Sequence, residues 1–543
     1  MGLGILEDKH MQHVPGTATL DDVDQLSYAP HSGHLKHAKD GTILVPQPSA
    51  SPSDPLNWPL PRRDAITAIL CLLSVLASTL SPLLAANTLT LTLYFERPFT
   101  DIALLTGWHL LGVGVAGYFF VASARVYGKR HLYLLGTVII IISSAWGGAS
   151  GHSYKSLVAA RVFQGVGLAP FEALVNASVG DLYFVHERGK RMALSNLSLF
   201  GGAFFTPVIV GKMTSTLGWQ WTFYFIAIFA AAMLPLVIFY VPETAFVRDS
   251  HLNTDITNAN ATTTERPKAD TELHAPNTSN THHPPPGSAP PILSRANLRI
   301  FNGRFADENF LQLLARPFPL FFHPGILWSC LIQATMIGWT VLIGIVLAAI
   351  MLGPPLFFNE VQTGYMYTGA FVGALIGFAI AGLLADPSAR WTTKRNHGVY
   401  EPEFRLLLVI PQLILGCGGL FGFGITAANT TRYGWFWPDF FFGMEVAGMV
   451  LGAVASALYI VDAHRDLSVE AFTCALVFKN VFSFGLTWSG FGWLNRGGIK
   501  VVFMAVGGVQ VGVCCLTILM YVYGKRNRSF FARHDILRIL RLR

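Results

Sequence analysis

Residues 326–352 read ILWSCLIQATMIGWTVLIGIVLAAIML, a run of 27 residues without Asp, Glu, Lys or Arg. About 20 apolar residues in a helix cross the hydrocarbon core of a bilayer. A backbone in lipid finds no water to hydrogen-bond, so a segment that spans the membrane must be helical. The run therefore predicts a transmembrane helix.

The same pattern recurs along the 543-residue chain, in which 52% of residues are hydrophobic and only 13% are charged. Soluble domains carry about 25% charged residues, so this composition indicates an integral membrane protein. We predict an all-α membrane protein with twelve transmembrane helices, over residues 65–88, 104–124, 131–150, 156–180, 193–213, 221–241, 326–352, 365–386, 405–427, 436–461, 471–493 and 499–523.

A polar segment divides these spans into six and six. Its run THHPPPGSAPP, at 281–291, has too few apolar residues to form a core and is expected to be disordered. The stretch DENFLQLLA, at 307–315, predicts a short amphipathic helix leading into the seventh span. The predicted organisation is a disordered N-terminus (1–62), two six-helix bundles (63–242 and 322–524), a largely disordered loop between them (243–321), and a basic C-terminal tail (525–543).

Lys and Arg gather in one set of short loops and in the C-terminal tail. This asymmetry predicts that both termini and the central loop are cytoplasmic. We expect a multi-pass protein of the plasma membrane, with the vacuolar membrane as the alternative. The net charge of +7 follows from these loops, so no nucleic-acid partner is expected. Asn429 begins the sequon Asn-Thr-Thr on the predicted outer side and is a predicted glycosylation site, whereas the sequons at Asn260 and Asn277 face the cytoplasm.

The sequence carries no pattern typical of an enzyme. Its six cysteines lack metal-ligand spacing, and no nucleophile–base constellation or phosphate-binding Gly-x-x-x-x-Gly-Lys loop is present. We therefore expect no catalytic residue, no metal and no cofactor. Gly112, Gly114 and Gly117 match a dinucleotide-binding fingerprint, but they lie inside an apolar span, where they predict close helix packing instead.

Four motifs stand out in the sequence, and two of them occupy corresponding places in the two halves. The turn after the second span reads VASARVYGKR (121–130), and the turn after the eighth begins GLLAD (382–386). The fourth span contains ARVFQGVG (160–167), and the fifth contains GAFFTPVIVG (202–211). The first two recur at the same position of each half, which indicates an internal repeat.

These motifs resemble those of the major facilitator superfamily. The resemblance implies that the two turns form a gating loop, with Arg125, Gly128, Lys129, Arg130 and Asp386 as its residues, and Arg125 stands where the family has Asp. The resemblance also implies the major facilitator fold, with two six-helix halves related by pseudo-symmetry.

The same resemblance assigns two further groups. Arg161 and Gln164 match a motif linked in the family to proton coupling. Gly202, Pro207 and Gly211 match the motif of drug:proton antiporters, with Thr206 and Val210 replacing two of its glycines. Blocks such as DPLNWP (54–59), DLYFVHERG (181–189), YEPEFR (400–405), VDAHRD (461–466) and FKN (478–480) resemble the histidinol/polyamine-permease-like branch of fungal transporters.

Ionisable residues inside a membrane span are costly and mark candidate functional sites. Glu172 lies near the middle of the fourth span and Glu445 near the middle of the tenth, its repeat partner. A carboxyl group in an apolar cavity can exchange protons and attract an ammonium, so both are candidate solute ligands and Glu172 is a candidate proton site. The alternative for each is a structural ion pair, and Lys479 is expected to form such a pair or to extend toward the interface.

Further candidate solute ligands are Trp339, Asn176, Gln333 and Asn87, with Trp339 offering either a cation–π face or a packing surface. We predict a secondary active transporter that moves a small organic cation, a polyamine or histidinol-like amine, with protons as the coupling ion and the lipid bilayer as its surroundings. The alternatives are a drug:proton antiporter that exports toxic compounds and a nutrient sensor that does not transport. The oligomeric state stays open.

Overall fold

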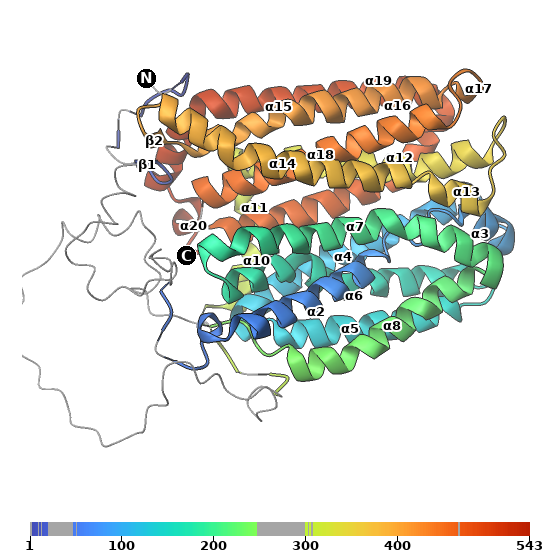
Figure 1. The fold of residues 1–543 in the computed structure, drawn as a ribbon, viewed down its shortest axis with the longest axis horizontal. Helices are drawn as coiled ribbons and strands as arrows, with labels where there is room; N and C mark the ends of the chain where they lie inside the picture. Colours follow the sequence, from blue (N-terminus) through green and yellow to red (C-terminus); the bar gives the residue numbers. More distant parts are fainter. Residues whose placement is uncertain are drawn as a thin grey trace, which may run out of the picture.

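The computed structural model describes residues 3–8, 10–11, 14–19, 47–49, 51–246, 299–301, 303–305, 308–464 and 467–542. Long helices run roughly parallel and form two groups, one from each half of the chain (Figure 1). The described ends of the chain, β1 and β2 lie at one end of the bundle, and α3, α13 and α17 lie at the other (Figure 1). We name these the inner end and the outer end, after the orientation that the loop charges predict.

The N-terminal half consists of seven helices. Their bounds are α2 Leu60–Ser78, α3 Thr88–Phe95, α4 Phe99–Tyr127, α5 Arg130–Gly148, α6 Tyr154–Leu182, α7 Val185–Leu217 and α8 Trp219–Tyr240. The first predicted span, 65–88, is not one helix, because the chain leaves the helix after Ser78 and re-enters it at Thr88. Pro82 lies in this break, where a missing N–H and a fixed φ oppose a continuous helix.

The C-terminal half begins with α12 Pro324–Leu352 and α13 Glu360–Tyr365. It continues with α14 Thr368–Arg395, η4 Pro402–Leu408, α15 Val409–Gln412, η5 Leu413–Cys417, α16 Gly418–Ala427, α17 Thr430–Tyr433, α18 Phe436–Ala463 and α19 Ser468–Arg533. The predicted span 405–427 therefore combines 3-10, α and π segments. Within α19, Gly498 has a non-helical backbone (φ 75°, ψ 157°), which divides it near the predicted boundary between two spans.

Among the described residues, ten helices are long and apolar enough to cross a membrane. The predicted count of twelve differs from this number at two places. Helix α19 counts once although Gly498 interrupts it, and α2 is not counted, because Arg62, Arg63 and Asp64 lie within its 19 residues. The all-α membrane architecture is confirmed, and the exact number of spans stays a prediction.

Short elements cover the inner end: η2 Pro55–Asn57, α10 Phe310–Ala315, α11 Pro317–Leu320 and α20 Ile536–Ile539. Helix α10 occupies the stretch predicted to be a short helix. Residues 247–298, which include most of the predicted disordered loop and the sequons at Asn260 and Asn277, lie outside the described residues.

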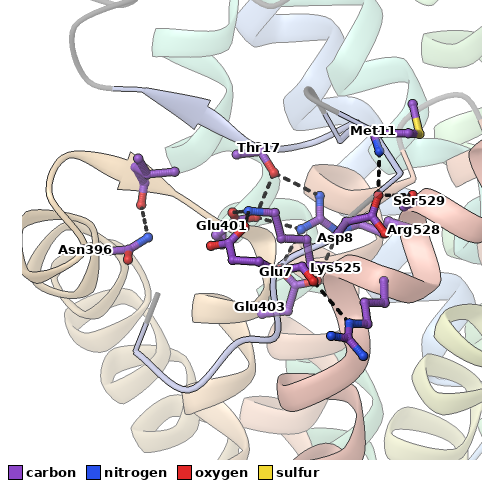
Figure 2. Close-up of polar contacts among 12 residues, drawn as sticks. Glu7, Asp8, Met11, Thr17, Asn396, Glu401, Glu403, Lys525, Arg528 and Ser529 are labelled. Atoms are coloured by element: carbon purple, nitrogen blue, oxygen red, sulfur yellow. Dashed lines mark hydrogen bonds and ion pairs between the residues drawn. The ribbon is translucent and has the colours of Figure 1, made fainter. Parts of the chain in front are cut away.

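Part of the predicted disordered N-terminus is ordered against the C-terminal half (Figure 2). Strand β1, Ala18–Thr19, pairs antiparallel with β2, Val399–Tyr400. Arg528 explains this contact. The residue is only 2% exposed, so its guanidinium needs partners, which it finds in Glu401 and Glu403 at 2.8 Å each and in the carbonyl oxygen of Pro15. A composition-based prediction of disorder could not include a partner from the other end of the chain.

Candidate functional site

A cavity of about 190 Å³ lies between the two halves. Residues of α4, α6, α7 and the break after α2 line it from the N-terminal half, and residues of α12, α18 and α19 line it from the C-terminal half. Most lining residues are apolar. The polar ones are Ser78, Ser81, Thr88, Thr106, Glu172, Thr340, Tyr367, Lys479, Asn480 and Ser483.

Glu172 lies in this cavity and forms an ion pair with Lys479. The carboxylate comes from α6 and the ammonium from α19, so the pair joins the two halves. Their side chains are 11% and 15% exposed. For Glu172 the structure thus shows the ion pair that was the alternative interpretation, and both members of the pair line the cavity.

Glu445 is placed differently. Its side chain is fully buried in α18 and is not among the residues that line the cavity. Its two carboxyl oxygens lie 2.9 and 3.0 Å from the hydroxyl of Thr340, which does line the cavity. The two predicted carboxylates therefore do not form one site, because a threonine separates Glu445 from the space that Glu172 faces.

The other predicted ligands lie outside the lining of the cavity. The indole N–H of Trp339 donates to Oε1 of Gln510 at 3.0 Å, and its ring packs edge-on against Phe482. Asn176 exchanges hydrogen bonds with Ser195 and Asn196 on α7. Gln333 is partly buried on α12, about one turn from the cavity-lining Ile337.

Asn87 is fully buried next to the cavity-lining Thr88. Among the described residues, its amide oxygen and nitrogen find no hydrogen-bond partner. Buried amides are normally paired, so the unpaired side chain of Asn87 is unusual, and Thr88 beside it is the residue that faces the cavity.

Arg161 and Gln164 lie behind the cavity wall rather than in it. Both are fully buried, and Nη1 of Arg161 donates to Oε1 of Gln164 at 2.9 Å and to the carbonyl oxygen of Leu80 at 2.6 Å. Nη2 reaches the carbonyl oxygen of Ser81 at 3.3 Å. The arginine therefore supplies hydrogen bonds to the backbone that α2 loses where its helix stops, and it holds the break whose residues line the cavity.

The predicted gating loops lie at the inner end. Nη1 of Arg125 on α4 contacts Oε1 of Glu470 on α19 at 2.7 Å, and its Nε contacts Oε2 of Glu308 at 2.8 Å. Arg125 therefore joins the two halves through an acidic partner, although it replaces the Asp of the family motif. In the second loop, Asp386 pairs with Arg405 at 3.1 Å within the C-terminal half.

The rest of the first loop has a structural role within its own half. Gly128 adopts a φ of +87°, and a Cβ there would lie 2.3 Å from the carboxylate of Glu243. This carboxylate accepts hydrogen bonds from the backbone N–H groups of Lys129 at 2.9 Å and Arg130 at 3.0 Å, and Arg130 is the first residue of α5. The glycine is required both by its backbone angle and by this close approach.

The antiporter-like motif lies along α7, at positions where backbone atoms of neighbouring helices come close to it. A Cβ on Gly202 would lie 2.7 Å from the carbonyl oxygen of Val75, and one on Gly211 would lie 2.4 Å from that of Glu360. Pro207 contributes the carbonyl oxygen that approaches Gly364. Since Glu360 and Gly364 belong to α13, Pro207 and Gly211 join the halves toward the outer end. Asn429, the predicted glycosylation site, is exposed just before α17 at this end.

Sequence patterns missed three residues. Thr340 and Glu470 are ordinary in sequence, and only the fold brings them to Glu445 and Arg125. His109 is fully buried and contacts Ser81 Oγ through Nε2 at 3.1 Å and the carbonyl oxygen of Arg161 through Nδ1 at 3.3 Å. A histidine within a predicted apolar span was the one available signal for it. Among the described residues, no group of three or more His, Cys, Asp or Glu is placed to hold a metal.

Comparison with known proteins agrees with this geometry. A family model described as Major Facilitator Superfamily matches residues 66–472. Protein HOL1 of Saccharomyces cerevisiae is 24% identical over 96% of this chain and 97% of its own length. Multidrug transporter TPO1_2 of Candida glabrata is 24% identical over 89% of this chain and 78% of its own length.

Among solved structures, a D-xylose-proton symporter aligns with a TM-score of 0.57 and 16% sequence identity, covering 86% of this chain and 99% of the symporter. A partially occluded inward-open structure of the xylose transporter XylE from E. coli aligns with a TM-score of 0.54 and 14% identity, covering 84% and 98%. Because the family model covers most of the chain and the two-bundle fold agrees with it, the chain belongs to the major facilitator superfamily, as a multi-pass secondary transporter rather than an enzyme.

Proposed function

We propose that the protein moves small organic cations, such as polyamines or histidinol-like amines, across the plasma membrane by alternating access driven by the proton gradient. The observation that carries the proposal is the carboxylate of Glu172 in a cavity between the halves. A carboxylate with apolar surroundings attracts an ammonium strongly, because little water screens the attraction. We also propose that both termini are cytoplasmic, as the loop charges predict.

Alternating access needs contacts between the halves that can open at one end at a time. The structure has such contacts at both ends: Arg125 with Glu470 at the inner end, and Gly211 against Glu360 toward the outer end. The cavity lies between these two sets of contacts. Rocking of the halves would break one set and expose the cavity to that side.

Glu445 supports the coupling to protons. It is fully buried, and Thr340 is the hydrogen-bond partner that the structure gives to its carboxyl group. An unpaired carboxylate in such a place is costly, so this carboxyl group is a candidate site for the coupling proton. Thr340 also lines the cavity, and its hydroxyl offers a path for a proton between Glu445 and the solute space.

Purified protein in liposomes tests the proposal. With an inward proton gradient we expect accumulation of labelled spermidine, and Glu172→Gln should abolish it because the amide carries no charge. Glu96→Gln is a matched control, since it makes the same substitution at an exposed residue just after α3, outside the lining of the cavity. Normal spermidine uptake by Glu172→Gln at every pH would refute the cation site.

A drug:proton antiporter is the second candidate, favoured by the mainly apolar lining of the cavity and by the similarity to a multidrug transporter of Candida glabrata. The direction of flux distinguishes the two. Accumulation of the solute with an inward proton gradient supports import by symport, and accumulation only with the gradient reversed supports export by antiport.

A further inference from the structure

Lys479 occupies the position that the proposed solute needs. Its side chain lines the cavity, and its ammonium group pairs with Glu172, the carboxylate assigned to the solute cation. Among the described residues, neither Lys479 nor Glu172 forms another ion pair. An organic ammonium therefore cannot reach Glu172 with this geometry unless Lys479 moves away.

The pair also has a role when no solute is bound. Both side chains are largely buried, and a buried charge that loses its partner is strongly destabilising. With Lys479 in place, the empty cavity holds one positive and one negative charge, which compensate each other. Without Lys479, the empty cavity would hold an uncompensated carboxylate between the two halves.

We propose that Lys479 is a built-in counter-ion, which occupies the cation site while the carrier is empty and gives it up to the incoming solute. This inference rests on the proposed function, because it takes the solute to be a cation that binds Glu172. A lysine suits the exchange, since its four-carbon stem is flexible and its charge is a compact ammonium like that of an amine solute. Asn480 and Ser483 of the same helix line the cavity and offer oxygen atoms to the displaced ammonium.

The consequence concerns the return of the empty carrier. Net transport requires the empty carrier to reorient, whereas exchange of labelled for unlabelled solute requires only the loaded carrier to reorient. The Glu172–Lys479 pair joins α6 of one half to α19 of the other and keeps the empty cavity neutral, so it permits the return step. Loss of the lysine charge should therefore block net transport and spare exchange.

The test uses full-length protein, Lys479→Met, and the conservative variant Lys479→Arg. Binding of labelled spermidine is measured in detergent, and net uptake and homoexchange are measured in liposomes. Lys479→Met should bind spermidine about tenfold more tightly, which corresponds to 1.4 kcal/mol, because the competing ammonium is gone. It should keep exchange and lose net uptake, and Lys479→Arg should retain both fluxes.

Several outcomes would overturn the inference. Weaker binding by Lys479→Met would mean that the lysine holds a part of the solute, and an equal loss of exchange and net uptake would mean a purely structural role. The double variant Glu172→Gln/Lys479→Met removes both charges and should fold even if Lys479→Met alone does not. Spermidine binding by this double variant would also contradict the inference. If wild-type protein neither binds nor moves spermidine, the proposed function fails, and the result differs from all of these.

Discussion

Gly211→Ala should hold the outer end of the protein open. A Cβ at this position would lie 2.4 Å from the carbonyl oxygen of Glu360 and 3.1 Å from its carbonyl carbon. These are backbone atoms, so no side-chain rotation relieves the contact. An ordinary contact begins near 3.4 Å, so α7 and α13 would have to separate by about 1 Å.

The magnitude follows from the cost of overpacking, which is about 1–3 kcal/mol for an added methyl group in a packed contact. Because opening of the outer end removes the clash, this energy acts on the conformational equilibrium rather than on folding. We expect a shift of about 5–150-fold toward outward-open states and a corresponding loss of transport rate. Gly201→Ala on the same helix is the matched control, since a Cβ there would meet only Phe371 Cε2, at 3.7 Å.

Pulsed electron paramagnetic resonance between spin labels on the two halves measures the shift. Lys155→Cys and Arg432→Cys place the labels on exposed residues of the outer end, and Cys515→Ser removes the native cysteine that is exposed. Gly211→Ala should lengthen the distance between the labels, and Gly201→Ala should not. Equal distances and equal transport rates in the two variants would refute the argument from close packing.

Three further predictions concern other regions. Arg125→Glu and Glu470→Arg should each slow transport at least severalfold, because each places like charges opposite one another across the halves. The double variant should recover part of the rate, since Glu308 and Arg316 would still face like charges; no recovery would contradict the inner contact. His323 caps α12 through Nδ1, which accepts from Gly325 N, and burial lowers its pKa to about 4. In the unfolded chain this histidine binds a proton below about pH 6.5, so its contribution to the free energy of unfolding should be fully present above that pH. Thermal unfolding should show a loss of about 2 kcal/mol between pH 7 and pH 5, and His323→Gln should remove this part of the pH dependence. Asn429→Gln should increase electrophoretic mobility of protein made in fungal cells as much as glycosidase treatment does, whereas unchanged mobility would contradict the predicted orientation.

Most membrane spans could be predicted because the requirement for apolar residues in lipid acts on each segment separately. The seventh predicted span, 326–352, matches α12 to within two residues, and the tenth, 436–461, matches α18 equally well. In the first predicted span, 65–88, Ser81–Pro82 indicates a kink, but the structure has a longer break, between Ser78 and Thr88, whose backbone receives hydrogen bonds from Arg161 of α6. A segment-by-segment prediction does not include a partner on another helix.

The candidate site was harder to predict for the same reason. The sequence indicated Glu172 and Glu445 as unusual charges; Glu445 is fully buried, and Glu172 lines the cavity. It offered an ion pair as the alternative for each glutamate and indicated Lys479 as a member of such a pair, but it did not assign Lys479 to Glu172. It gave no indication that Thr340 stands between Glu445 and the cavity. Such relations depend on how helices far apart in sequence face each other, and the hydrophobic pattern leaves the rotation of each helix about its axis only loosely defined.

The two ends of the cavity are joined by different physical interactions, and this difference affects how each can open. The inner contact is an ion pair at a partly exposed position: Arg125 is 36% exposed and has a second acidic partner in Glu308. Salt and water weaken such a pair, and its members can exchange partners during opening. The outer contact is chiefly backbone against glycine, with a hydrogen bond across the halves from the hydroxyl of Thr90 to the carboxylate of Glu360, and its opening needs a movement of whole helices. Increased salt at the inner side should therefore favour inner opening, while the outer end should respond chiefly to side-chain volume, as Gly211→Ala tests.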